Sequence, residues 1–177
     1  SYTDFNTLWE KFNYEFLVLV PREKQALAES ILGTNLDESN AWTLAKNQAV
    51  ARLAADPSDI YARFNLAIAA YHLGDYQQTV NEYEQIAARL PARTLWYQIE
   101  PLAAYYHLGD YQRLFTLSEE ILNQGNRAYS ELYLLRGQAY QEQGRLEAAR
   151  IEYEKAVFYN RNSSAAQAAL AAVTASN

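Results

Sequence analysis

The heptapeptide YHLGDYQ occupies residues 71–77 and recurs letter for letter at residues 106–112. A degenerate third copy, QEQGRLE, follows, so that Gly74, Gly109 and Gly144 are spaced 35 residues apart. A constant interval of this size is typical of proteins built from repeated helical pairs, because one pair alone cannot bury its apolar face. The sequence therefore predicts an all-α stack of helical pairs, with each glycine in the turn between the two helices of a pair.

The unit around the third copy has the residue types of a known repeat. Aromatic and small side chains alternate along it, as the close packing of two helices requires. The positions are Tyr133, Gly137, Tyr140, Gly144, Ala149, Tyr153 and Ala156. This unit and the spacing of the three copies resemble the tetratricopeptide repeat (TPR) of about 34 residues. The resemblance implies a helical-hairpin TPR solenoid of three repeats over residues 60–161, a fold that usually binds proteins rather than catalysing reactions.

Helical segments flank the predicted repeats on both sides. Residues 21–57 are predicted to form two flanking helices, the first of which ends at Gly33. Residues 163–175 are predicted to form a C-terminal capping helix, for which a serine pair at its start can supply the N-cap. In the second repeat, Pro101 falls inside the expected first helix and removes a backbone hydrogen bond, so we expect a kink or a late helix start.

The first twenty residues differ in character from the rest. Residues 4–13 carry apolar side chains at helical spacing, and residues 14–20 form a short aromatic and β-branched run that predicts a strand. A lone strand in an α-solenoid has no neighbouring strand to pair with, so we expect it to belong to a β-sheet that this sequence lacks. The chain also begins with Ser1 rather than methionine. One interpretation is that residues 1–20 are the tail of a missing upstream domain.

Composition and charge exclude several classes of function. The chain has 177 residues with 50% hydrophobic side chains, which indicates a folded protein. Its net charge of −6 and its lack of a lysine or arginine cluster argue against nucleic-acid binding, which depends on a basic surface. The apolar run at residues 16–20 is far shorter than the roughly 20 residues of a membrane span. With no cysteine, the chain holds no thiolate nucleophile and no cysteine-based metal site.

The order of motifs along the chain carries a second resemblance. Residues 9–13 (WEKFN) lead into residues 16–21 (FLVLVP), and residues 95–98 (LWYQ) precede Pro101 and the second Gly-Asp-Tyr turn. This order resembles the C-terminal region of bacterial proteins in which a papain-like cysteine peptidase domain, of the type related to double-glycine leader peptidases, is followed by TPRs. The resemblance implies that the catalytic residues lie upstream of Ser1, and that this chain is a recognition or regulatory module appended to a peptidase.

In TPR proteins the first helix of each repeat lines a concave face, with positions two, five, nine and twelve pointing into it. The resemblance implies a groove that is aromatic at its N-terminal end and polar beyond. Its partner-binding residues are Tyr61, Phe64, Ile68, Tyr71, Trp96, Ile99, Tyr106 and Gln138. An aromatic concavity suits a peptide or a partner helix, because tyrosine and tryptophan supply rigid contact area with a polar tip. An alternative is that the chain's own N-terminal segment already fills the groove.

Two further patterns admit more than one interpretation. His72 and His107 occupy equivalent repeat positions near aspartates and could bind zinc, but repeat duplication alone explains them, so neither a metal nor a cofactor is predicted. The glutamates of the second helices are interpreted as a solvated outer face rather than as paired catalytic carboxylates; they are Glu82, Glu84, Glu119, Glu120, Glu152 and Glu154.

No nucleophile and base can be combined into a catalytic site from these residues. The sequence therefore predicts a non-catalytic protein–protein interaction module whose partner is a protein or peptide, as the C-terminal part of a larger peptidase-like protein. The alternative is a free-standing scaffold that self-associates, for example as a homodimer, through its N-terminal segment or its groove.

Overall fold

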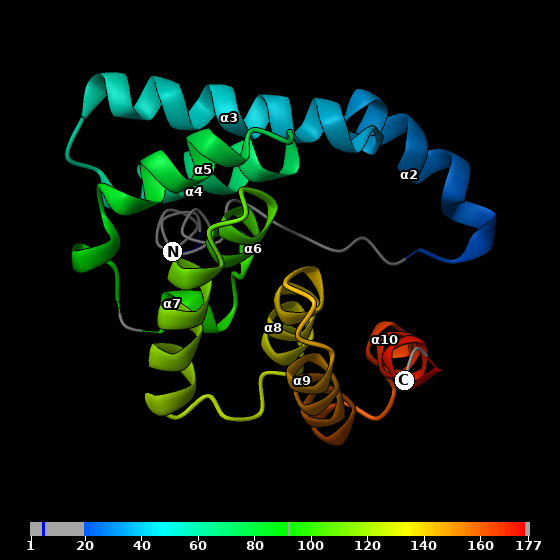
Figure 1. Cartoon of the computed structure of the whole chain (residues 1–177). Coiled ribbons are helices and arrows are strands. Elements are labelled where there is room, and N and C mark those ends of the chain that lie inside the picture. The colour runs from blue at the N-terminus through cyan, green and yellow to red at the C-terminus, as the bar shows by residue number, and fades with distance from the viewer. Residues whose placement is uncertain (1–4, 6–19, 92, 176–177) are drawn as a thin grey trace. The chain divides into compact units, whose positions relative to one another are not determined.

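A computed structural model of the chain describes residue 5, residues 20–91 and residues 93–175, and every regular element within these ranges is helical (Figure 1). The chain divides into two compact units, Ser1–Leu90 and Pro91–Asn177. The first unit contains η2 (Arg22–Lys24), α2 (Gln25–Leu32), η3 (Gly33–Leu36), α3 (Glu38–Ala55), α4 (Ile60–His72), α5 (Tyr76–Glu84) and η4 (Ala87–Arg89). The second unit contains η5 (Thr94–Trp96), α6 (Glu100–His107), α7 (Tyr111–Asn123), α8 (Ser130–Glu142), α9 (Leu146–Tyr159) and α10 (Ser164–Ala175).

In the first unit, α4 is the central helix, and both α3 and α5 pack against it (Figure 1). Small side chains along α4 allow its neighbours to approach closely, so that most of the helix is buried. The buried residues of α4 are Ala62, Phe64, Asn65, Leu66, Ala67, Ile68, Ala69 and Ala70. By contrast, among the residues that the structure describes, α2 makes substantial contacts only with the neighbouring 3₁₀ helices η2 and η3.

Aspartate side chains cap the N-termini of the two long helices of this unit. Asp59 Oδ1 accepts hydrogen bonds from the backbone N–H groups of Tyr61 at 3.0 Å and Ala62 at 2.9 Å, at the start of α4. Asp37 Oδ1 accepts one from the N–H of Asn40 at 2.8 Å, at the start of α3. Each such cap satisfies helix donors that have no partner within the helix and contributes about 1 kcal/mol.

The three repeat glycines end their helices with one shared geometry. Gly74, Gly109 and Gly144 have φ angles of 82°, 74° and 71°, which a residue with a Cβ adopts only at a cost. After the first of them, the N–H of Asp75 donates to the carbonyl of Ala70 at 2.9 Å, five residues back, as in a Schellman motif. The prediction that these glycines lie in the turns between paired helices is confirmed.

In the second unit, α8 and α9 form the most closely packed pair. Gly137 on α8 lies so close to the Tyr153 ring on α9 that a Cβ at this position would overlap it. The Tyr153 hydroxyl donates to Gln141 Oε1 at 2.8 Å, and its ring packs with Ala149 and with Val173 of α10. The small and aromatic residues of the third repeat therefore pack as the TPR pattern predicts.

The ends of the second unit also agree with the sequence. Ser163 Oγ accepts a hydrogen bond from the N–H of Ala166 at 3.3 Å, and the capping helix α10 follows and packs on α9. At the other end, α6 begins only at Glu100, with Pro101 in its first turn, which is the late helix start expected for the second repeat.

Two predictions about domain organisation are not tested by these helices. The strand expected over residues 14–20 lies, apart from Val20, outside the described residues. The division into segments 1–20, 21–57, 60–161 and 163–175 stays a prediction, and the boundary between the compact units, after Leu90, falls inside the predicted repeat block.

Candidate protein-interaction surface

In the first unit, the predicted groove residues all lie on α4 but differ in accessibility. Phe64 and Ile68 have exposed fractions of only 1% and 0%, so solvent does not reach them. Tyr61 and Tyr71 are half-buried, with part of each side chain at the surface. Of these four residues, only the two tyrosines are therefore accessible to a partner in this conformation.

Tyr71 belongs to an aromatic arrangement that recurs in the second repeat. Its ring meets the ring of His72 edge-on at 5.4 Å and lies 5.5 Å from the Tyr76 ring. Tyr106 does the same in α6, with His107 edge-on at 5.4 Å and Tyr111 at 6.1 Å. Both tyrosines are half-buried. The identical heptapeptides thus build the same half-exposed tyrosine setting twice.

The surroundings of Tyr106 favour the protonated form of its hydroxyl. Partial burial, followed by the nearby Glu142 and Tyr111, raises the pKa of Tyr106 above its ordinary value. Burial, followed by Tyr106 and Glu142, also raises the pKa of Tyr153 to about 12. At neutral pH both groups are uncharged, and the Tyr106 hydroxyl can act as a hydrogen-bond donor at the surface.

Trp96 in η5 and Ile99, the N-cap residue of α6, both precede α6 and are half-buried. The Arg93 guanidinium lies over the Trp96 ring at 4.9 Å, an arrangement that holds the indole by a cation–π contact. The Trp96 Nε1 is buried and has no hydrogen-bond partner among the residues that the structure describes. A buried donor in this state costs about 1–3 kcal/mol.

In the third repeat, the predicted groove residue Gln138 is half-buried on α8. Nearby on the same helix, Arg136 donates from Nε to Glu152 Oε2 at 2.7 Å and from Nη1 to Ser118 Oγ at 2.7 Å. In the first unit, Arg63 on α4 pairs with Glu82 on α5 at 2.6 Å.

The interpretation of the second-helix glutamates as a solvated outer face is wrong for Glu82 and Glu152, whereas the other four glutamates are exposed. Glu152 is buried and Glu82 half-buried, and each binds an arginine from the first helix of its own repeat. The reason is the length of the arginine side chain, which reaches across the helical pair to the carboxylate. The signal available in the sequence was a glutamate at the same position of the first and third repeats, each in a repeat whose first helix also carries an arginine.

The histidines do not form a metal centre with other side chains of the described chain. The His72 ring stacks on the Trp42 ring of α3 at 3.8 Å with an interplanar angle of 3°. Within residues 20–91 and 93–175, no group of three or more His, Asp or Glu side chains is placed to hold a metal ion.

A shallow hollow of about 390 Å³ lies where α7 faces the turn between α8 and α9. Beside it the Phe115 and Tyr140 rings stack at 4.4 Å, and the Arg145 guanidinium lies 4.6 Å above the Tyr140 ring. The lining residues are Gln112, Phe115, Thr116, Glu119, Gln143 and Arg145. The hollow is mixed in polarity and open, so it extends the accessible surface of the second unit without enclosing a small molecule.

None of the helices in the part of the chain that the structure describes has the length and apolar character needed to cross a membrane.

Comparison of the sequence with protein-family profiles and with curated proteins finds no match. Among solved structures, a crystal structure of MamA covers 91% of this chain and 86% of its own, with a TM-score of 0.66 and 13% identity. MamA 41-end from Desulfovibrio magneticus RS-1 covers 79% and 85%, with a TM-score of 0.61 and 17% identity. TTC0263, a thermophilic TPR protein in Thermus thermophilus, covers 82% and 79%, with a TM-score of 0.59 and 20% identity.

At these identities the likeness concerns the fold. The described helices and these structural neighbours together establish an all-α, TPR-like solenoid, as the repeated glycines predicted.

Proposed function

We propose that the chain is a non-catalytic protein-interaction module that binds a peptide or a partner protein on the first helices of its repeats. The observation that carries this proposal is the repeated tyrosine setting, in which Tyr71 and Tyr106 are half-buried and each is held by a histidine and a second tyrosine. A ring held in place by its neighbours loses little entropy on binding, and its exposed part offers a rigid contact.

The accessible side chains of the predicted groove make the direct contacts in this proposal. They are Tyr61, Tyr71, Trp96, Ile99, Tyr106 and Gln138, all half-buried. Phe64 and Ile68 take part only from the core, by supporting α4, because both are buried. Stacked helical pairs of the TPR type commonly serve as binding scaffolds, which supports this assignment at the level of fold.

We further propose that the module is the C-terminal recognition or regulatory part of a larger peptidase-like protein. The order of the motifs in residues 9–21 and 95–111 supports this context. The module would then present a substrate or a partner to a catalytic domain upstream. The alternative function is a free-standing scaffold that self-associates through its N-terminal segment or its groove.

The test is selection of ligands from a displayed library of random peptides, followed by affinity measurement on variants. Tyr71→Ala and Tyr106→Ala should each weaken binding of the selected peptides by about tenfold or more, which corresponds to about 1.4 kcal/mol. Tyr106→Phe should retain most of the affinity, because it keeps the ring. Gln138→Ala should have the smallest effect, since it removes no aromatic contact.

Circular dichroism of each variant guards against a loss of fold being mistaken for a loss of contact. If the library yields no specific peptide, or if folded Tyr71→Ala and Tyr106→Ala variants bind as tightly as the wild type, the proposed aromatic face is not the binding surface.

A further inference from the structure

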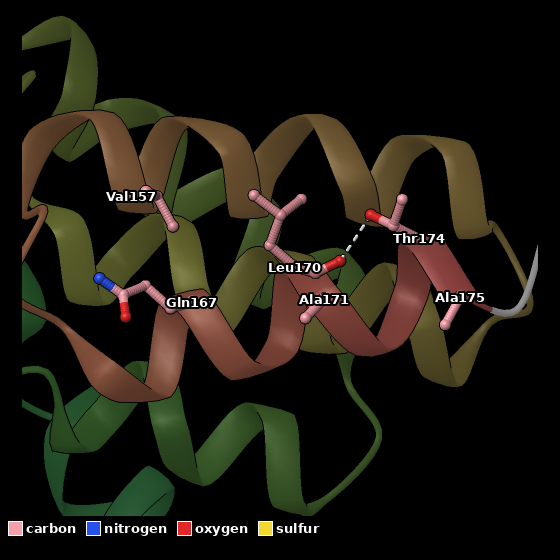
Figure 2. Close-up of a pocket in the computed structure, with 6 residues that line it drawn as sticks. All are labelled: Val157, Gln167, Leu170, Ala171, Thr174 and Ala175. Atoms are coloured by element: carbon pink, nitrogen blue, oxygen red, sulfur yellow. Dashed lines mark hydrogen bonds between the residues drawn. The ribbon is translucent and has the colours of Figure 1, made fainter.

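A groove of about 510 Å³ lies between α9 and α10 in the second unit (Figure 2). Its apolar part comes from one residue of α9 and three of α10, and two polar residues complete it. The lining residues are Val157, Gln167, Leu170, Ala171, Thr174 and Ala175. Those on α10 recur three or four positions apart, so they form one continuous stripe on the helix.

The polar side chains of the groove already have partners. Thr174 Oγ1 donates to the Leu170 carbonyl at 2.7 Å (Figure 2), and Gln167 Nε2 donates to the Arg161 carbonyl at 2.6 Å. Val157 and Leu170 are half-buried and pack on the core from the other side, which fixes the floor of the groove. The groove therefore presents a fixed apolar surface, which suits an apolar helix face better than a charged ligand.

Among the helices that the structure describes, α10 packs substantially only on α9. In the repeats before it, α5 packs on α4, α7 on α6 and α9 on α8. The groove lies where such a second helix would bury its apolar stripe. A helix is therefore the occupant that this surface fits.

The same chain carries a short helix with an uncovered apolar face. Leu27 and Ile31 of α2 have exposed fractions of 59% and 74%, and their spacing of four residues places them on one side of the helix. No other α-helix packs substantially on α2 among the described residues. The eight residues of α2 extend about 12 Å, which is also the length of the α10 stripe from Gln167 to Ala175.

We propose that α2 of one copy packs into the α9–α10 groove of a second copy, with Leu27 and Ile31 directed against Val157, Leu170 and Ala171. The two surfaces differ, so each copy can both donate a helix and accept one. One eight-residue helix buries an area at the low end of protein interfaces, below about 1,200 Å², so the association is weak and reversible. It involves neither Tyr71 nor Tyr106 and goes beyond the proposed peptide-binding function.

The test is sedimentation velocity of the 177-residue chain over a wide range of concentration. The wild type should show a sedimentation coefficient that rises with concentration. Ile31→Lys and Ala171→Glu place charges on the exposed helix and in the exposed groove, and each should raise the apparent dissociation constant at least about tenfold. Phe158→Lys is the matched control, because Phe158 is 69% exposed on α9 but does not line the groove.

A mixture of the two charged variants separates this arrangement from a symmetric one. The Ile31→Lys copy keeps an intact groove and the Ala171→Glu copy keeps an intact α2, so the mixture should form a dimer and nothing larger. A wild type that stays monomeric at every concentration would overturn the proposal. An Ala171→Glu variant that associates like the wild type would also overturn it, because α2 would then bind somewhere other than the groove. A Phe158→Lys variant that weakens association as much as Ala171→Glu would overturn it as well.

Discussion

The substitution Gly137→Ala tests the close contact between α8 and α9. A Cβ at position 137 would overlap Cε1 and Cδ1 of Tyr153 and lie 3.1 Å from its Cζ, inside the usual carbon contact distance of about 3.5–4.0 Å. The ring cannot easily retreat, because it is 1% exposed, packs against Ala149 and Val173, and holds a hydrogen bond from its hydroxyl to Gln141. Overpacking of this kind costs about 1–3 kcal/mol or more.

Helix propensity acts in the opposite direction. Replacing a mid-helix glycine by alanine ordinarily stabilises a helix by about 0.5–1 kcal/mol. Because the new methyl group would overlap two atoms of a buried ring, the overpacking cost lies at the upper end of its range, and we expect a net loss of about 2 kcal/mol for Gly137→Ala. With a urea dependence of about 2 kcal/mol per molar, the unfolding midpoint followed by far-UV circular dichroism should fall by about 1 M.

The matched background for this experiment is Tyr153→Leu, which removes the ring that the new methyl group would meet. In that background Gly137→Ala should be neutral or stabilising, so that the double-mutant cycle gives a coupling of about 2 kcal/mol or more. If Gly137→Ala stabilises the wild-type chain, or costs the same with and without the ring, the close contact between these residues does not decide the packing of α8 on α9.

Three further predictions concern a cap, a titration and an ion pair. Asp110→Ala removes the acceptor for the Arg113 N–H (3.1 Å), and thermal unfolding should show a loss of about 1 kcal/mol; an unchanged midpoint would contradict the cap. Burial raises the pKa of Tyr153 from 10.0 to about 12, so the folded state holds this proton more tightly than the unfolded state does. Its contribution to stability is complete below pH 10 and is lost as the pH rises to about 12, so urea unfolding should reveal an alkaline loss of up to roughly 2–3 kcal/mol that Tyr153→Phe lacks. Glu152→Ala leaves the half-buried Arg136 guanidinium without its 2.7 Å carboxylate partner and should cost about 3 kcal/mol in urea unfolding, with Glu152→Gln closer to the wild type; equal stability of all three proteins would refute this role.

Features with a local cause could be predicted from the sequence. The turn at Gly74 depends on a residue that tolerates positive φ, and the start of α10 depends on the hydroxyl of Ser163. The late start of α6 follows from the missing N–H of Pro101. Each of these needs only a few neighbouring residues, so the letters of the chain carry the information.

The environments of individual side chains were less predictable. Glu152 carries a charge, which favours the surface, yet it is buried because Arg136 reaches it from another helix. Phe64 and Ile68 occupy groove positions of the TPR pattern, but both are buried, and Tyr71 on the same helix is not. Periodicity identifies which face of a helix a residue occupies, and packing by distant segments determines whether that face is open.

The sequence by itself determined the repeat, its turns and the class of fold, because glycines at this regular spacing, with small and aromatic residues between them at helical intervals, are typical of stacked helical pairs. Only the tertiary structure decided which side chains reach solvent. In the folded chain Tyr71 and Tyr106 are half-buried, the apolar face of α2 is exposed, and a groove lies between α9 and α10. Exposure depends on residues far apart in the chain, and their contacts exist only once the helices have packed.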